Sequence, residues 1–270
     1  MKQLILGTFI GRVALSIRDK VEILYTLAFK QVQLPTLLND KLASYLMTRI
    51  CLNNKAFLDI GSHIGSVIAE VHQTSPTVTI IAFEAMPEKV LKLRKRFPFA
   101  EIHCYALGED SGNVIFHINK RLSGYSSLLK PDTATQGDYV SITVEMKRLD
   151  DIVTCNDIDV IKIDVEGAEL GVLRGGLKLI NRNRPLIIFE SGPEIQQDSQ
   201  VKYTKSELFD FFTTIDYGIV VPNRLANNDP GLNKDCFIES HLFPRRTTNY
   251  FGVPNERRVE FRDSARRILG

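Results

Sequence analysis

The stretch FLDIGSHIG, residues Phe57–Gly65, joins a short apolar run to a turn that contains two glycines. The apolar run predicts a buried strand, and Gly61 and Gly65 end it. Residues 66–74 follow with apolar side chains at the spacing of one helical face. Glycines in such a turn let the backbone approach a ligand, and the next helix presents unpaired amide groups at its N-terminus. By itself this GxxxG spacing indicates a tight strand-to-helix turn as readily as a ligand site.

The rest of the chain alternates strand-like and helix-like segments. Apolar runs that favour strands occur at 78–83, 160–163 and 186–189, and a further strand is expected at 101–105. Helices are expected from Pro87 to about Arg96 and over residues 168–180. Three later runs are expected to complete the sheet: 206–215, 219–221 and 249–253. The alternation predicts an α/β fold with an open, doubly wound, mostly parallel sheet, whose strands are apolar because both faces are covered.

Two segments depart from this alternation. Residues 114–118 and 140–144 favour strands separated by a polar loop, and we expect them to form an inserted antiparallel hairpin. Residues 1–52 have apolar positions at mixed spacings of three and four, punctuated by Pro35 and by Asn39-Asp40. The predicted organisation is a helical N-terminal extension over 1–52, one domain over 53–256, and a basic C-terminal tail over 257–270.

The composition is that of an ordinary globular protein. The chain has 270 residues, 44% of them hydrophobic, and a formal net charge of +2, which is too small to indicate a nucleic-acid partner. Its four scattered cysteines favour reduced thiols over a disulfide framework or a zinc site. Neither an export signal nor an apolar run long enough to span a membrane is present, so we expect a cytoplasmic protein.

Acidic residues follow four of the predicted strands, namely Asp59, Glu84, Asp164 and Glu190. Ligands of an open parallel sheet bind at the carboxyl ends of its strands, so these acids are expected to form a polar rim there. Glu84 lies 19 positions after Gly65, where a carboxylate can accept both hydroxyls of a ribose. The pattern indicates an adenosine-containing ligand and leaves open whether it is a nicotinamide cofactor.

An ordered set of motifs narrows the choice of adenosine-containing ligand. They are the glycine turn, FEAMP at 83–87, ALG at 106–108 with DSG at 110–112, GYSSL at 124–128, IKIDVEGAE at 161–169 with LRG at 173–175, 185–190, and NYFGVP at 249–254. Over residues 55–254 the chain resembles the FkbM-type methyltransferases, members of the class I S-adenosylmethionine-dependent fold. The resemblance implies a Rossmann-like, seven-stranded sheet and S-adenosylmethionine as cofactor. Ser62-His63 departs from the family's usual Ala-Asn.

The resemblance also implies roles for individual residues. Asp59 and the turn Gly61, Ser62, His63 and Gly65 would lie beneath the methionine part of the cofactor. Glu84 would bind the ribose, and Ala85, Met86, Ala106 and Leu107 would enclose the adenine, although each of these apolar residues is equally suited to a core. Asp164 would lie nearest the transferred methyl group, in contact with the cofactor.

Methyl transfer to a hydroxyl needs a group that removes the hydroxyl proton. Asp164, Glu166 and His63 are the candidates for this base, with Glu190 and His241 as weaker ones. Glu166 and Glu169 could instead favour the start of the following helix. Asp150-Asp151 resembles a helix start, and no metal is predicted, because dispersed acids do not identify an oxygen-ligand site.

Three functions stay open at this point. The first is O-methylation of a hydroxyl on a sugar, glycan or secondary metabolite, a substrate class that comes from the resemblance. The second is a nicotinamide-dependent oxidoreductase, and the third is a non-catalytic adenosine-binding module. The basic pairs 245–246, 257–258 and 266–267 favour a solvated surface, or else an anionic acceptor such as a glycolipid. In that case the N-terminal segment would contact the inner face of a membrane. The sequence does not indicate an oligomeric state.

Overall fold

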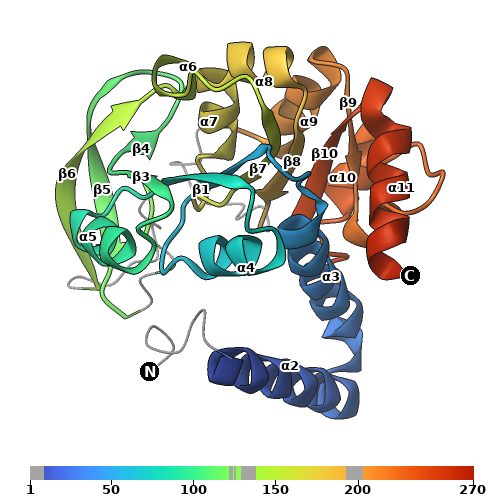
Figure 1. Ribbon diagram of the computed structural model, residues 1–270. Coiled ribbons are helices and arrows are strands. Elements are labelled where there is room, and N and C mark those ends of the chain that lie inside the picture. Colours follow the sequence, from blue (N-terminus) through green and yellow to red (C-terminus); the bar gives the residue numbers. More distant parts are fainter. Residues whose placement is uncertain (1–8, 122–123, 125, 129–137, 193–202) are drawn as a thin grey trace.

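The computed structural model describes residues 9–121, 124, 126–128, 138–192 and 203–270 (Figure 1). Its main sheet has the order β3-β2-β1-β7-β8-β10-β9. The strands are β1 (Ala56–Ile60), β2 (Thr79–Phe83), β3 (Glu101–His103), β7 (Ile158–Ile163), β8 (Leu186–Glu190), β9 (Tyr217–Val220) and β10 (Asn249–Pro254). The first five pair in parallel, and β10 runs antiparallel to both of its neighbours. The predicted α/β class and the mostly parallel seven-stranded sheet are confirmed.

Helices cover both faces of this sheet, as a doubly wound fold requires. One face packs on α3 (Leu34–Ile50), α4 (Ser66–Thr74), α5 (Pro87–Arg96) and α11 (Arg258–Leu269). The other packs on α6 (Leu149–Ile152), α7 (Glu169–Gly175), α8 (Leu177–Asn183), α9 (Lys205–Thr214) and α10 (Lys234–Glu239). Strand β1 shows why both faces are apolar: Phe57 belongs to the first core, and Leu58 and Ile60 belong to the second.

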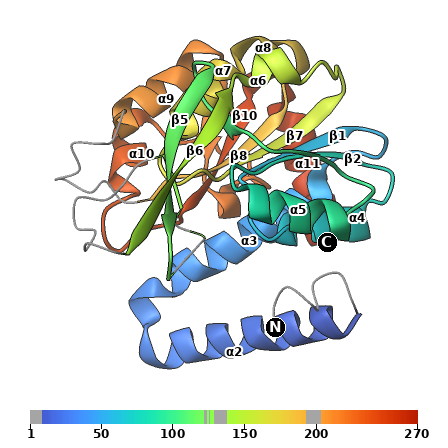
Figure 2. The same ribbon diagram turned by 90° about the vertical axis from the view of Figure 1, so that its left-hand side faces the viewer.

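The predicted inserted hairpin is confirmed, with longer strands than expected. Strands β5 (Gly112–Asn119) and β6 (Tyr139–Lys147) pair antiparallel from Gly112 opposite Met146 to Asn119 opposite Tyr139 (Figure 2). The short β4 (Ala106–Leu107) pairs in parallel with β6. A small apolar cluster of Ala85, Met86, Ala106, Phe116 and Val144 joins this second sheet to the carboxyl end of β2. The insertion therefore lies at the edge of the main sheet where a ligand is expected.

The N-terminal segment divides into two parts with different surroundings. It is helical as predicted, with α2 (Phe9–Phe29), a single 3-10 turn η1 (Gln31–Gln33) and α3, whose first turn holds Pro35. The prediction that Asn39-Asp40 interrupts the segment is wrong. Both residues lie inside α3, and their side chains hydrogen-bond to a distant segment instead of ending the helix. Asn39 donates to the carbonyl of Arg246 at 2.8 Å, and Asp40 accepts from Thr247 and Thr248 at 2.6 and 2.8 Å. Residues 1–8 lie outside the described part of the chain.

Two of the predicted boundaries need correction. Helix α3 places Ala43, Leu46 and Ile50 in the core, so it packs as part of the domain that was expected to begin at residue 53. The predicted tail at 257–270 is helix α11, with Phe261 and Ala265 in the same core. We therefore propose a domain that extends from α3 to the end of α11. Among the described residues, no helix is long and apolar enough to cross a membrane.

Two of the predicted elements have a different form. The helix expected over 168–180 is two helices that meet at Gly176, whose backbone is not helical, with φ −110° and ψ 14°. The preceding Gly175 passes so close to Gly108 that a Cβ would lie 2.0 Å from the Gly108 carbonyl oxygen. The run at 206–215 is helix α9 and not a strand. Thr204 and Glu207 form a capping box at its start, which fixes the helical conformation.

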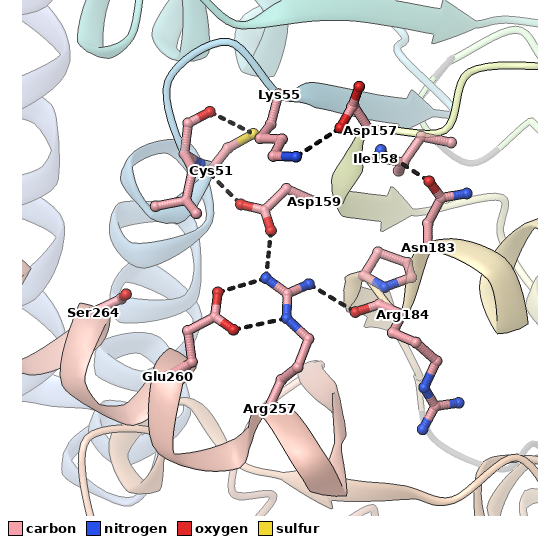
Figure 3. A network of polar contacts seen from close by, with 12 residues as sticks. Cys51, Lys55, Asp157, Ile158, Asp159, Asn183, Arg184, Arg257, Glu260 and Ser264 are labelled. Atoms are coloured by element: carbon pink, nitrogen blue, oxygen red, sulfur yellow. Dashed lines mark hydrogen bonds and ion pairs between the residues drawn. The ribbon is translucent and has the colours of Figure 1, made fainter.

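Arg257, the first residue of the basic pair Arg257-Arg258, connects α11 to the main sheet. Arg257 bridges the buried Asp159 at 2.8 Å and Glu260 of α11, and it donates to the carbonyl of Arg184 at 2.8 Å (Figure 3). Asp159 lies near the start of β7 and also accepts from the amide of Leu52 at 2.9 Å. The network thus ties α11 to the amino ends of the strands, at the opposite edge from the predicted ligand site.

Candidate active site at the carboxyl ends of the strands

A cavity of about 330 Å³ opens at the carboxyl ends of β1, β2, β7 and β8. A volume of this size lies within the range of small-molecule sites. The insertion supplies part of the wall, through Phe116 and the segment that contains Gly124, Ser126 and Leu128. The remaining lining residues are Ile60, Gly61, His63, Phe83, Glu84, Ala85, Lys89, Tyr105, Ala106, Leu107, Asp164, Val165, Glu166, Ala168 and Glu190.

The cavity gathers most of the predicted site residues. All three candidate bases, Asp164, Glu166 and His63, line it, and so does Glu190. Of the predicted cofactor residues it contains Gly61, His63, Glu84, Ala85, Ala106, Leu107 and Asp164. Four others lie behind the wall and do not line it: Asp59, Ser62, Gly65 and Met86. His241 lies elsewhere, buried against the carbonyl of Phe237 and the hydroxyl of Ser191 at 2.7 and 2.9 Å.

The glycine turn is fixed by close contact with β7. Gly61 has φ +82°, and a Cβ there would lie 1.8 Å from the carbonyl oxygen of Asp164. A side chain at this position would therefore force the turn away from β7. The Ser62 hydroxyl donates to the carbonyl of Asp59 at 2.8 Å, so it closes the turn instead of facing a ligand. The turn after β1 therefore lies directly against the residue that follows β7, at the edge of the cavity.

A buried lysine links three parts of this site. Lys162 Nζ lies 3.5 Å from Asp59 Oδ1, 3.2 Å from Asp164 Oδ2 and 3.0 Å from the carbonyl oxygen of Gly61. Although burial alone would lower the pKa of the Lys162 ammonium, Asp164 and Asp59 raise it above its usual range. Burial raises the pKa of Asp59, whose carboxylate is completely enclosed and has Lys162 as its neighbouring cation. Asp59 does not line the cavity and influences its charge through the ion pair with Lys162.

Glu84 is held rigidly in the wall of the cavity. Its two carboxylate oxygens accept from the amides of His63 and Met86 at 2.8 and 3.0 Å. Burial raises the pKa of Glu84, an effect that the nearby Lys89 and the two amides oppose. Each carboxylate oxygen keeps a second lone pair. The geometry therefore suits a ligand that offers two neighbouring hydroxyl groups, such as a ribose.

Three carboxyl groups come together in the lining of the cavity. Asp164, Glu166 and Glu190 each offer an oxygen atom, and these atoms lie within 4.8 Å of one another. Burial and the adjacent Asp164 raise the pKa of Glu190, so at neutral pH this carboxyl keeps its proton. Burial would also raise the pKa of Asp164, but Lys162 and a hydrogen bond with Glu190 hold it below its usual range. Carboxylates of this kind also bind hard cations, so this is the place where a metal would be held.

Glu166 and His63 differ from the other titratable residues of the cavity in backbone conformation and in side-chain pKa. Both have positive φ, +54° and +49°, which is uncommon for residues with side chains and is found at functional sites. Burial, together with Asp164 and Glu169, raises the pKa of Glu166 to about 7. Burial and Lys89 lower the pKa of His63 to about 4, so this imidazole is neutral at pH 7. The Ser127 hydroxyl of the insertion donates to the Glu166 carbonyl at 2.6 Å and supports this turn.

Glu169 has a structural role, one of the two alternatives for this residue. Its carboxylate is buried, accepts from the hydroxyl of Tyr203 and accepts from the amide of Gly167 at 3.0 Å. It does not line the cavity. Asp150, expected at a helix start, lies in α6 and accepts from the amides of Lys178 and Leu179 at 3.1 and 2.8 Å, where it caps α8.

Several lining residues were not predicted as site residues. Lys162 could have been noticed, because it is a charged residue inside an otherwise apolar strand. Ser126 and Leu128 belong to a motif that supports the family resemblance, but no role in the site was predicted for them. Lys89, Tyr105 and Phe116 gave no local signal, since their place at the cavity depends on how α5 and the insertion pack.

Comparison with known proteins gives consistent results. A family model described as the methyltransferase FkbM domain matches residues 59–217. The chain is similar to Methyltransferase 1 of Beauveria bassiana, with 26% identity over 141 residues, which is 44% of this chain and 57% of that protein. It is also similar to the 2-O-methyltransferase NoeI of Sinorhizobium fredii, with 28% identity over 161 residues, 52% of this chain and 65% of that protein. The chain thus spans under two thirds of these relatives.

Among solved structures, a methyltransferase FkbM from Methylobacillus flagellatus matches with a TM-score of 0.44 and 19% identity. The match covers 73% of this chain and 43% of that one.

Proposed function

Because this chain belongs to the FkbM methyltransferase family, we propose that it transfers a methyl group from S-adenosylmethionine to a hydroxyl oxygen of a small acceptor. The observation that carries the proposal is that one cavity is lined both by residues suited to an adenosine and by a cluster of three carboxyl groups. Glu84, Ala85, Ala106 and Leu107 are suited to an adenosine, and the three carboxyl groups are suited to removing a proton.

The chain's own residues fit the cofactor. Glu84 would accept the ribose hydroxyls through the lone pairs that its two amide donors leave. Ala85, Ala106 and Leu107 would pack against the adenine, and the Gly61–His63 turn would meet the methionine part. When bound, S-adenosylmethionine supplies an electrophilic methyl group on its sulfonium and leaves as S-adenosylhomocysteine.

We assign the general base to Glu166 in preference to Asp164 and His63. A base works best when its pKa lies near the working pH, and the pKa of Glu166 is about 7. Asp164 is bound to Lys162 at 3.2 Å and has a lowered pKa, so it removes a proton poorly. His63 has a pKa of about 4 and is a weak base. As the acceptor oxygen gains the methyl group, its proton passes to the Glu166 carboxylate.

The acceptor is expected to be neutral or cationic at its reacting end. The cavity contains carboxyl groups beside the reaction centre, and the basic pairs 245–246, 257–258 and 266–267 do not line it. An anionic group close to the transferred methyl would face the ionised Glu166 that the reaction requires, and none of these basic pairs offers it a cation. We therefore favour an uncharged polyol, such as a sugar, and the name of the similar 2-O-methyltransferase supports oxygen as the accepting atom.

A methyl-transfer screen against hydroxylated sugars, glycans and metabolites tests the proposal. A mass increase of one methyl group, lost in the Glu166→Gln variant, is the expected result. Binding of S-adenosylmethionine without turnover of any acceptor class would favour the non-catalytic module. The family membership removes the support for the nicotinamide-dependent oxidoreductase.

A further inference from the structure

Helix α2 presents its polar side to the protein and its apolar side to the outside. Ile17, Val21, Leu24 and Ala28 recur at intervals of four, three and four residues, which places them on one helical face, and all four are exposed. Leu24 is 63% exposed. Both views show α2 away from the two sheets, connected to the domain through α3 (Figures 1 and 2). Contiguous exposed apolar faces of this kind mark interaction sites.

The opposite face of α2 is the one that contacts the domain. Thr26 is buried, and Lys41 of α3 binds Asp19 and Glu22 at 3.0 and 2.8 Å. These contacts fix the rotation of the helix about its axis. The apolar stripe therefore points outward because of specific ion pairs.

The borders of the stripe carry positive charge and amphipathic side chains. In helical projection Arg18 lies on one side of the stripe and Lys20 on the other, and both are exposed. Arg18 also contacts the neighbouring Asp19 at 2.7 Å. Tyr25 and Leu27, both about half exposed, widen the apolar surface. The two acidic residues of the described α2 side chains, Asp19 and Glu22, face Lys41 instead.

We propose that α2 lies flat on an anionic phospholipid bilayer, with the stripe in the acyl region and Arg18 and Lys20 at the headgroups. An apolar stripe bordered by cations, with Tyr25 at the boundary, has the chemistry of an interfacial helix. The described part of the chain contains no helix able to span the bilayer, so α2 would rest on it. A second copy of the chain is a poorer occupant, because pairing two stripes would bring cationic borders together.

This proposal does not depend on methyl transfer, and vesicle co-sedimentation of the full chain tests it. The wild-type chain is expected to sediment with vesicles of phosphatidylserine and phosphatidylcholine, and only weakly with phosphatidylcholine alone. The double variant Val21→Glu/Leu24→Glu should bind the anionic vesicles at least about tenfold more weakly. Lys20→Glu should weaken binding about fivefold, since one cation becomes an anion.

Leu91→Glu is the matched control, because Leu91 on α5 is 68% exposed and lies outside the stripe. It should bind like the wild type. All substituted side chains are exposed, so thermal unfolding should not change, and this is measured alongside. Equal sedimentation of the wild type and the double variant overturns the proposal. It is also overturned if the wild type ignores anionic vesicles and forms a dimer, seen by sedimentation velocity, that the double variant loses.

Discussion

The ammonium group of Lys162 donates to the carbonyl oxygen of Gly61 at 3.0 Å, so a residue of β7 holds the turn that follows β1. The same ammonium lies beside Asp59 and Asp164, and it neutralises carboxylates on both strands. The glycine turn and the motif at 161–169, which both belong to the family resemblance, are therefore parts of one charged structure. We expect the loss of this structure to destabilise the fold and to change the shape of the cavity.

Replacing this lysine should destabilise the fold. Lys162→Met leaves the buried Asp59 without its cation, and breaking a buried pair in this way costs about 3–5 kcal/mol. Adding Asp59→Asn should recover part of the loss, because one uncompensated carboxylate is removed. Denaturant unfolding measures both changes. Lys178→Met, at an exposed position of α8, is the control and should leave the unfolding free energy within about 0.5 kcal/mol; an equally small effect of Lys162→Met contradicts the role.

The pH dependence of turnover should follow Glu166. A base with a pKa of about 7 is protonated and inactive below that value, so kcat/KM should rise with pH through about 7 and then level off. Glu166→Gln should abolish this limb and lower kcat by about 10²–10⁴-fold, with cofactor affinity retained. Asp164→Asn should keep the limb. If Asp164→Asn removes it and Glu166→Gln does not, the base is Asp164.

Removing metal should not change the activity. Glu190 keeps a proton and Lys162 neutralises Asp164, so the three-carboxyl cluster has little net negative charge to hold a divalent cation. Treatment with a chelator, followed by dialysis, is expected to leave kcat unchanged. Loss of activity that Mg²⁺ or Mn²⁺ restores would assign the cluster Asp164, Glu166 and Glu190 to a metal.

The Arg257 network should affect stability and not acceptor binding. Arg257→Leu leaves the buried Asp159 without its cation, and we expect a loss of about 3 kcal/mol in unfolding free energy. The acceptor KM should stay the same, because the network lies at the amino ends of the strands. Arg266→Leu, at an exposed position of the adjoining helix α11, should change the stability by less than about 1 kcal/mol. A raised KM with unchanged stability would return the basic pair to a role in acceptor binding.

Most of the sheet could be predicted from sequence because four of its five parallel strands, β1, β2, β7 and β8, are mostly apolar runs. The edge of the sheet that holds the site could be predicted because Glu84, Asp164 and Glu190 end those strands or directly follow them. Asp59 was placed in the same rim for the same reason, yet it lies inside β1, opposite Lys162 in the register, where the neighbouring strand covers it. A one-residue difference in where a strand ends decides between a ligand contact and a buried ion pair.

Other features depend on contacts between distant segments. The glycine pair Gly175-Gly176 marks the break between α7 and α8 in the sequence, but the close approach of Gly175 to Gly108 depends on the fold. Arg257 has the same sequence context as any surface arginine, and only the fold brings it to Asp159. The exposed stripe of α2 has the spacing of a buried helical face, so its orientation could be known only from the structure.

The binding of adenosine-containing cofactors tests the central claim most directly. Calorimetric titration of the wild-type chain and of Glu84→Ala with S-adenosylmethionine, S-adenosylhomocysteine and NAD compares the candidate ligands, with the exposed Glu88→Ala as control. We predict that both adenosylated sulfur compounds bind, that NAD does not, and that Glu84→Ala weakens their binding by about 1.5–3 kcal/mol while Glu88→Ala does not. Binding of NAD alone, or equal affinity of the wild type and Glu84→Ala for S-adenosylhomocysteine, would contradict the account.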